Sequence, residues 1–310
     1  MQIEEELVKL SAEKDMLLTI GVFDGVHLGH RYLISQLKEL ARQQNLVSGV
    51  VTFRQHPQEV LSPQTKLPFL TDFAQRTNLL KNEGVEAIIT LSFTPELAQL
   101  NARQFIALLK KYLGMRGVVI GPDFALGRNR EGNTNTLRRL GREMGFSVTA
   151  VPPIVIDGEV VSSTAIRNAL AEGDMKRVQK LVGRPFSLHG HVIPGAGRGV
   201  ELGFPTANLD TDPEQALPAE GVYVGWVHID DQAYPSMTNI GKRPTFGGNE
   251  RVVEVYLLDY HSDLYGQELT IDIIERLRGE KKFDAPEELK KRITKDIKQG
   301  RAILKTKGGN

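Results

Sequence analysis

Two histidines in a glycine-rich run near residue 25 form the first group of side chains suited to chemistry. The run Gly21-Val-Phe-Asp-Gly-Val-His-Leu-Gly-His30 lies between an apolar segment and an amphipathic one, so we expect a turn from a strand into a helix. Glycines there let backbone amides approach an anion, and the start of a helix favours phosphate. His27 and His30 share one side of the first helical turn, where imidazoles can stabilise charge on a transferring phosphoryl group. The structural alternative is a glycine-rich turn with two surface histidines.

A second group lies between residues 195 and 208, in the run Gly-Ala-Gly-Arg-Gly-Val-Glu-Leu-Gly-Phe-Pro-Thr-Ala-Asn. On an extended segment, the oxygens of Thr206 and Asn208 face the same side. Two hard oxygens without a carboxylate suit Mg²⁺ that is held mainly by nucleotide phosphates. The alternatives are a hairpin loop built by the glycines and a strand-edge proline with turn residues. Glu254 stands in an apolar run, so it is either an outward-facing residue of a half-buried strand or functional.

The first half of the chain alternates short apolar runs with stretches of helical periodicity. We expect strands over Met16–Phe23, Val47–Phe53, Ala87–Leu91, Gly117–Ile120 and Ser147–Val151, and helices over Leu28–Gln44, Asp72–Asn82, Pro95–Leu113 and Thr134–Met144. This alternation is typical of a parallel sheet with helices on both faces. Such sheets bind ligands at the carboxyl ends of their strands, and the first glycine-rich run follows the first strand.

The second half of the chain has a different pattern. Strand-like segments are separated by turns rich in glycine and proline, and we expect no helix among them: Phe186–Ile193, Gly221–Ile229, Val252–Asp259 and Leu269–Leu277. This predicts a small antiparallel barrel or sandwich. A final helix is expected to start with Asp284 as N-cap and Glu287 completing a capping box, with Leu289, Ile293, Ile297 and Leu304 on its apolar face. The boundary at Gly183-Arg184-Pro185 predicts two domains, 1–182 and 183–310.

Composition narrows the class of protein. The chain has 310 residues, 39 Lys and Arg against 38 Asp and Glu, and no cysteine. The balanced charge argues against a nucleic-acid partner, and the lack of cysteine excludes disulfides, thiolate metal ligands and cysteine nucleophiles. The sequence contains no apolar stretch of about 18 residues, the length that would predict a membrane span. Its polar, acidic start is unlike a signal peptide. We therefore expect a cytoplasmic protein; the sequence leaves its oligomeric state open.

The first half of the chain resembles the nucleotidyltransferase superfamily that transfers AMP to a phosphate, through His27-x-Gly29-His30. The longer string resembles the start of bacterial bifunctional riboflavin kinase/FMN adenylyltransferases, and further motifs follow in the family's order: His56-Pro57, Gly121-Pro-Asp-Phe-Ala-Leu-Gly127 and Val161-Ser-Ser-Thr-Ala-Ile-Arg167. The resemblance implies a Rossmann-like domain with His27 and His30 as catalytic residues. Its implied ATP and phosphate contacts are Gly21, Phe23, Asp24, Gly25, Gly29, Ser163, Thr164 and Arg167. Its implied flavin and nucleotide pocket contains His56, Pro57, Asp123, Phe124 and Asn133.

Structural roles could also explain some of these residues. Ser163 is a good N-cap for a helix over Thr164–Ala171, while Arg167, about one turn later, could bind the same anion. Asp123 is also typical of a turn. The nucleophile of this chemistry, a phosphate of FMN, is already ionised, so the protein has mainly to position reactants and stabilise charge.

The second half resembles the riboflavin kinase module, through Gly203-Phe-Pro-Thr-Ala-Asn208 and later pieces such as Asn239-Ile-Gly-Lys-Arg-Pro-Thr245 and Asp263-Leu-Tyr-Gly266. The resemblance implies a small barrel with a C-terminal helix, in which Glu254 is the general base toward the 5′-hydroxyl of riboflavin. A primary alcohol must lose a proton while it attacks the γ-phosphate. Thr206 and Asn208 are the implied metal ligands. The implied ATP and flavin contacts are Gly195, Gly197, Arg198, Gly199, Gly203, Phe204, Pro205, Asn239, Arg243 and Arg278.

Together these features predict an α/β plus β fold and a bifunctional enzyme. Riboflavin and ATP give FMN in the C-terminal domain, and FMN and ATP give FAD and pyrophosphate in the N-terminal domain, with Mg²⁺ as cofactor. The alternatives are a riboflavin kinase with an inactive N-terminal domain, a non-catalytic flavin- or RNA-binding regulator, and an enzyme that uses another phosphate acceptor or transfers CMP. The intact His27 and His30 argue against an inactive N-terminal domain. A non-catalytic regulator would leave Glu254 and the Thr206/Asn208 pair unexplained. The attached kinase module argues against another acceptor or CMP transfer, because its product is the substrate of the first domain.

Overall fold

The computed structural model describes residues 2–10, 14–62, 64, 67–195, 198–230, 232–245 and 248–307. The chain forms two compact units, Met1–Ser163 and Thr164–Asn310. This division falls between Ser163 and Thr164, upstream of the expected boundary. The boundary expected between residues 182 and 183 stays a prediction about the domains.

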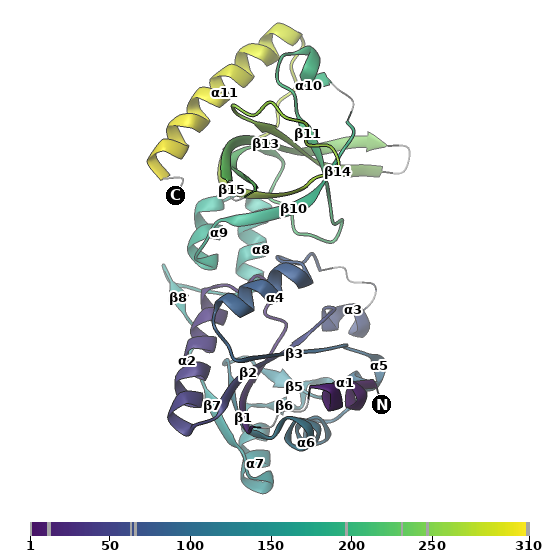
Figure 1. The fold of residues 1–310 in the computed structure, drawn as a ribbon, viewed down its shortest axis with the longest axis vertical. Helices are drawn as coiled ribbons and strands as arrows, with labels where there is room; N and C mark the ends of the chain where they lie inside the picture. The colour runs from purple at the N-terminus through teal and green to yellow at the C-terminus, as the bar shows by residue number, and fades with distance from the viewer. Residues whose placement is uncertain are drawn as a thin grey trace. The chain divides into compact units, whose positions relative to one another are not determined.

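The first unit is built on a sheet of five parallel strands in the order β3-β2-β1-β4-β7 (Figure 1). The strands are β1 (Met16–Ile20), β2 (Val47–Phe53), β3 (Ala87–Leu91), β4 (Met115–Ile120) and β7 (Ser147–Ala150). From β1 the chain adds β2 and then β3 on one side. It then returns to add β4 and β7 on the other side of β1. The strand order therefore reverses between β1 and β4, where parallel sheets bind ligands.

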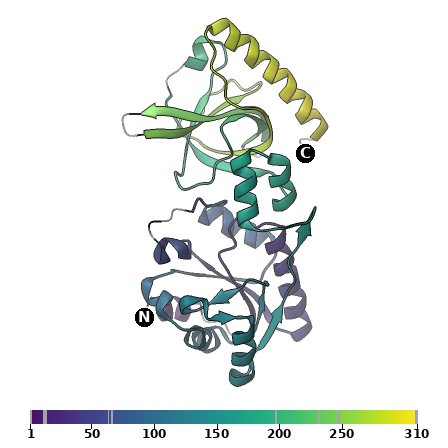
Figure 2. The same cartoon turned by 180° about the vertical axis from the view of Figure 1, so that it is seen from behind.

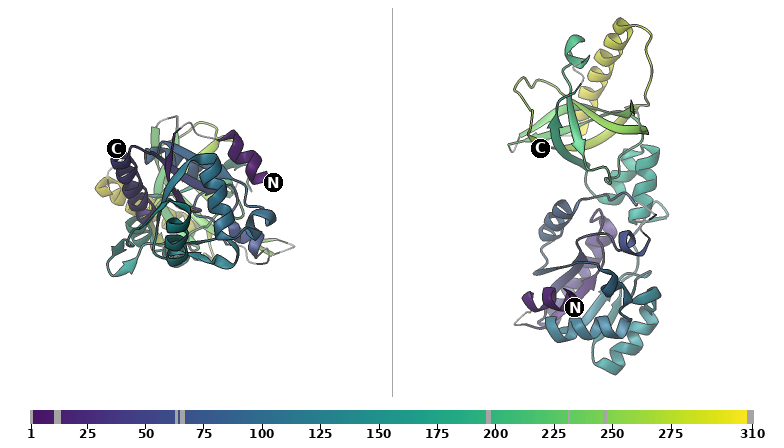
Figure 3. Two further views of the ribbon diagram at one scale, coloured as in Figure 1. Left: turned by 90° about the horizontal axis from the view of Figure 1, so that it is seen from below. Right: turned by 90° about the vertical axis from the view of Figure 1, so that its right-hand side faces the viewer.

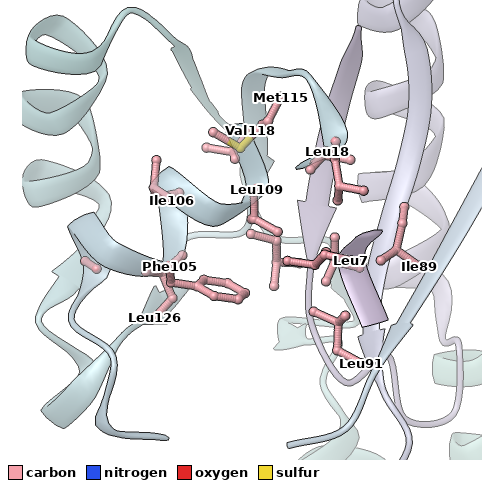
Figure 4. Packing of buried hydrophobic residues seen from close by; sticks show 14 of the residues in the cluster. Leu7, Leu18, Ile89, Leu91, Phe105, Ile106, Leu109, Met115, Val118 and Leu126 are labelled. Carbon is pink, nitrogen blue, oxygen red and sulfur yellow. The ribbon is translucent and has the colours of Figure 1, made fainter. Parts of the chain in front are cut away.

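Helices cover both faces of this sheet, as the alternating pattern predicted (Figures 1 and 2). Even-numbered residues of β1, such as Leu18, face a core shared with α1 (Gln2–Lys9), α6 (Ala102–Leu113) and α7 (Thr134–Met144). Leu17 faces the opposite core, shared with α2 (Leu28–Gln44) and α4 (Phe73–Asn82). Figure 4 shows the first core, where Leu7 of α1 lies close to Leu109 of α6.

The predicted elements of the first unit match the structure closely, with one break. The expected helix over Pro95–Leu113 is two helices, α5 (Pro95–Gln99) and α6, because Asn101 starts α6 with a capping box. Helix α1 was not predicted. Further short elements are α3 (Pro57–Leu61), the 3₁₀ turn η1 (Arg128–Arg130), and the hairpins β5 (Ala125–Leu126) with β6 (Gly132–Asn133) and β8 (Val155–Ile156) with β9 (Glu159–Val160).

The second unit is built on a closed antiparallel barrel (Figure 3). Around the barrel, the strand order is β10-β11-β14-β13-β12-β15. Its strands are β10 (Phe186–Ile193), β11 (Ala207–Thr211), β12 (Gly221–Ile229), β13 (Gln232–Thr245), β14 (Gly248–Leu257) and β15 (Glu268–Arg278). Two helices precede it, α8 (Ser163–Glu172) and α9 (Met175–Val182), and α11 (Pro286–Lys307) packs outside it, where Leu304 joins Val224 and Ile274 in a core. The α/β plus β fold is confirmed.

Two expectations for this unit were wrong. A short helix, α10 (Arg198–Glu201), lies between the first strands of the barrel. Helix α11 begins at Pro286, and its first turn is closed on the carbonyl of Ala285, so Asp284 is not its N-cap. Proline pre-sets the backbone for the first helical position, which moves the start past the aspartate.

Candidate active sites

The loop between β1 and α2 carries the first group of predicted residues, at the point where the strand order reverses. Its backbone is unusual: Phe23, Gly25 and Val26 have φ of 57°, 81° and 35°. Positive φ is costly for a β-branched residue such as valine, so other contacts must hold this loop. Gly21 N–H donates to Val51 O at 3.0 Å, and Thr52 Oγ1 donates to the carbonyl of Val22 at 3.1 Å.

His27 and His30 lie together at the start of α2. His27 is the N-cap, and its Nδ1 accepts the backbone N–H of His30 at 3.3 Å. That bond occupies the Nδ1 lone pair, so a neutral His27 ring carries its hydrogen on Nε2. The two rings stack with centroids 3.6 Å apart, and the rings of Phe23 and His30 meet edge to face with centroids 5.2 Å apart. A Cβ at Gly29 would lie 3.2 Å from the His27 ring, so glycine leaves room for it.

The electrostatics of His30 follow from its burial. Its Nδ1 is buried and has no hydrogen-bond partner among the residues that the structure describes. Burial lowers the pKa of His30 well below its usual value, and the neighbouring His27 lowers it further. His30 is therefore neutral at pH 7 and acts as a dipole rather than as a cation.

Asp24, expected among the phosphate contacts, is buried in this loop, with 3% of its surface exposed. Its carboxylate accepts the backbone N–H groups of Leu70 and Thr71, at 2.9 and 3.1 Å, and its carbonyl accepts Ser163 Oγ at 2.9 Å. The neighbouring Gly25 N–H donates to Thr71 Oγ1 at 3.0 Å. These bonds point Asp24 into the protein, and phosphate contact by this residue remains an untested prediction.

Ser163 is the first residue of α8 rather than the residue before it, so the expected N-cap position is off by one. Its hydroxyl donates to the carbonyl of Asp24. Thr164 follows it, and Arg167 lies one turn further along the helix. The ATP contacts expected of these three residues remain predictions.

The remaining pocket residues expected in the first unit begin two helices and a turn. His56 is the N-cap of α3, where its Nδ1 accepts Gln58 N–H at 3.1 Å, and Pro57 is the first helical residue. Asn133 caps α7 by accepting two backbone N–H groups, each at 3.1 Å. Asp123 is exposed in a turn, and Phe124 packs against the sheet core. Asp123 closely follows the end of β4, and Asn133 pairs with Ala125 in the hairpin of β5 and β6.

In the barrel, three predicted residues form one row across adjacent strands. Glu254 of β14 is paired in register with Asn208 of β11 on one side and with Asn239 of β13 on the other. The flanking residues Val253 and Val255 are buried in the barrel interior, so the three polar side chains share its outer face. The structure places Glu254 on this outer face, between two amides, and its role as general base remains a prediction.

The glycine-rich segment comes close to this row. A Cβ at Gly195 would clash with the Asn208 amide, and a Cβ at Gly199 would lie 3.0 Å from Thr206 Oγ1. Gly203 has φ of 82°, and Phe204 N–H donates to Gly199 O at 2.8 Å. The ring of Phe204 packs edge-on against Tyr256, the outer-face residue next to Glu254, at 5.8 Å. Gly197 lies outside the described residues, and of Arg198 and Arg243 only the backbone is described.

A cavity of about 260 Å³ opens beside Pro205 and Thr206. Its wall combines apolar residues such as Leu257 with two tyrosines of the loop after β14, Tyr260 and Tyr265. Apart from Asp263 to Gly266, which resembles the kinase module, no sequence motif points to this loop.

Arg278, expected among the kinase contacts, ends β15 beside α11. Its Nε donates to Asp296 Oδ2 at 2.8 Å, and Arg292 lies 2.9 Å from the other carboxylate oxygen. Asp296 is only 2% exposed. Arg278 therefore joins the barrel to its C-terminal helix.

Both units match family models. Residues 9–165 match the FAD synthetase model, and residues 182–304 match the riboflavin kinase model. A bifunctional riboflavin kinase/FMN adenylyltransferase of Pseudomonas fluorescens is 38% identical over 98% of each chain. Its counterpart from Escherichia coli K12 is 36% identical over 92% of this chain and 91% of its own.

The fold also matches a solved structure. A crystal structure described as a macrolide-efflux protein from Streptococcus pneumoniae has a TM-score of 0.89 and 32% identity, with 97% of each chain covered. Within the described part of this chain, no helix is long and apolar enough to cross a membrane. Sequence relatives and family models agree on both halves, and the chain belongs to the bifunctional riboflavin kinase/FMN adenylyltransferase family.

Proposed function

We propose that the loop with His27 and His30 catalyses adenylylation of FMN, and that the row around Glu254 catalyses phosphorylation of riboflavin. The observation that carries this assignment is the placement of Glu254 between Asn208 and Asn239 on one face of the barrel. It supplies a base for an alcohol nucleophile. The histidine loop, by contrast, needs no base because the FMN phosphate is already ionised.

For adenylyl transfer, the stacked histidines act as hydrogen-bond donors, and His30 does so in its neutral form. The Nδ1 of His27 accepts a backbone N–H, which leaves Nε2–H to donate to an oxygen of the α-phosphate. Donors fixed before the reaction stabilise charge as it develops, without reorganisation. Within the first unit, Ser163, whose hydroxyl donates to the carbonyl of Asp24, is proposed to contact ATP phosphates.

For the kinase, Glu254 removes the proton of the 5′-hydroxyl of riboflavin as it attacks the γ-phosphate of ATP, and ADP leaves. We assign the cavity beside Thr206 to the nucleotide, because its apolar wall with Tyr260 and Tyr265 suits a planar base.

We propose Mg²⁺ as the metal of the kinase reaction. Thr206 and Asn208 offer neutral oxygens near the Glu254 row, a donor set that fits an ion held mainly by phosphates. Among the described residues, no cluster of three histidines or carboxylates could form a self-sufficient metal site. When bound, Mg²⁺ would neutralise charge on the nucleotide phosphates. A cytoplasmic location, with its ATP and reducing conditions, is part of the same proposal.

Chromatography of flavins after incubation with riboflavin, ATP and Mg²⁺ tests both assignments. FMN should appear first and FAD should follow, and omission of Mg²⁺ should stop both steps. If FMN accumulated but no FAD formed, even when FMN was supplied, this result would contradict the role of the first unit. FAD formed from supplied FMN, without phosphorylation of riboflavin, would contradict the role of the barrel.

A further inference from the structure

The loop that carries His27 has an energetically costly backbone. Three of its residues, Phe23, Gly25 and Val26, have positive φ, and Phe23 and Val26 are not glycines. Such conformations cost about 1–3 kcal/mol each and persist only where surrounding contacts hold them. Val26 directly precedes His27, so a relaxed loop would move the imidazole.

The contacts that hold the loop converge on a second segment, Leu70–Thr71, just before α4. Leu70 and Thr71 donate their backbone N–H groups to the Asp24 carboxylate. Thr71 Oγ1 accepts Gly25 N–H at 3.0 Å and lies 3.5 Å from Asp24 Oδ1. A Cβ at Gly25 would meet the Leu70 side chain at 2.9 Å, so the two segments are packed without a gap.

Thr71 is placed to act on the histidines only through this loop. It is 3% exposed, and its hydrogen bonds to Asp24 and Gly25 are directed into the loop rather than outward. Buried Arg76 adds to the arrangement, since its charge attracts Asp24 and one of its Nη atoms donates to the carbonyl of Phe53, at the carboxyl end of β2, at 2.6 Å. Hydrogen bonds to an ionised carboxylate are stronger than those between neutral groups.

We propose that Thr71 is a positioning residue for adenylyl transfer, which holds Gly25 and Val26 in their positive-φ conformations and thereby fixes His27 and His30. This inference rests on the proposed role of the histidines. It also gives Asp24 a role distinct from phosphate contact, because a carboxylate engaged with backbone N–H groups acts through the loop.

Replacement of Thr71 by valine tests the hydroxyl while keeping the shape of the side chain. A small displacement of a catalytic group can cost about 10²-fold in rate, so T71V should lower the kcat for FAD formation by about 10- to 100-fold, with smaller changes in KM. Serine keeps the hydroxyl, so T71S should stay within about threefold of the wild type if the inference is right.

Two controls separate positioning from general damage. Thr19 of β1 is also fully buried, but its hydroxyl has no hydrogen-bond partner within the described part of the chain, so T19V should retain the wild-type rate. Riboflavin phosphorylation in the same preparations should be unchanged. Unaltered FAD formation in T71V would overturn the proposal. So would an equal loss in T71S or T19V, or an equal loss of kinase activity in T71V.

Nuclear magnetic resonance of the imidazoles provides a readout that does not depend on activity. The signals of His27 and His30 should move in T71V and stay in place in T19V. If the wild type formed no FAD, the proposed function would fail, but these signals would still test the positioning role. Unmoved signals in T71V would overturn the positioning role even where FAD formation is intact.

Discussion

The ring of His30 lies almost flat against the ring of His27, with 17° between their planes and 3.6 Å between their centroids. At this separation two imidazolium ions would repel each other, and burial already opposes a charge on His30. The pair therefore works with His30 neutral, and this has a consequence for stability.

Stability of the first unit should fall at acidic pH because of His30. Its native pKa is lowered below the ordinary value of 6.5, so the unfolded chain binds a proton that the native state does not. The free energy of unfolding should therefore decrease as pH falls below about 6.5, by up to about 1.4 kcal/mol per pH unit from this one group. Urea unfolding of wild type and His30→Asn between pH 5 and 8 measures this. Identical pH dependence in the two proteins would contradict it.

Loss of either imidazole should affect only FAD formation. Replacing His27 or His30 by alanine should lower that rate by about 10²–10³-fold, the scale for one charge-stabilising donor, and FMN formation should survive. His27→Asn is the sharper variant because asparagine is also a good N-cap. Exposed His228, whose partner is Asp272, provides the control His228→Ala. A parallel fall of both activities would refute separate sites.

Glu254→Gln should abolish phosphorylation of riboflavin, because an amide cannot accept the proton of the 5′-hydroxyl. FAD synthesis from supplied FMN should continue at the wild-type rate. Exposed Glu268, on β15 of the same barrel, gives the matched control Glu268→Gln, which should phosphorylate normally. Unimpaired phosphorylation in Glu254→Gln would remove Glu254 from the mechanism.

Asp296→Ala should destabilise the barrel. The carboxylate is buried between Arg278 and Arg292, and removal of one partner from a buried ion pair typically costs about 3–5 kcal/mol. Faster hydrogen exchange of the backbone amides in α11 and β15 would report this loss of stability. The exposed pair Arg301–Asp259 serves as control, since Asp259→Ala should cost less than about 1 kcal/mol. Equal costs for the two variants would show that burial of Asp296 adds nothing.

The strands and helices of the first unit could be predicted because their periodicity is strong. Helices over Leu28–Gln44 and Thr134–Met144 have the predicted bounds. The barrel was harder to predict. Strand β13 contains Pro235, Gly241 and Pro244, residues that usually mark turns, and β11 was assigned only as part of a ligand motif.

The sequence was enough to predict residues for the candidate sites, but not how the fold places their side chains. Glu254, Asn208 and Asn239 are far apart in the chain, and only the register of three strands puts them in one row. The orientation of Asp24 could not be predicted either, because its partners at residues 70 and 71 are backbone amides, which no side-chain motif reveals.

The closed order of the barrel also governs when the kinase site can form. Strand β10 pairs with β15, where Phe186 lies opposite Ile273. The barrel therefore cannot close until β15, its last strand in the chain, is available. Contacts between such distant segments form slowly, and during synthesis the C-terminal strand leaves the ribosome late. The parallel sheet can start from β1 and β2, which are separated only by α2. A nascent chain should therefore gain the adenylyltransferase fold well before it can phosphorylate riboflavin.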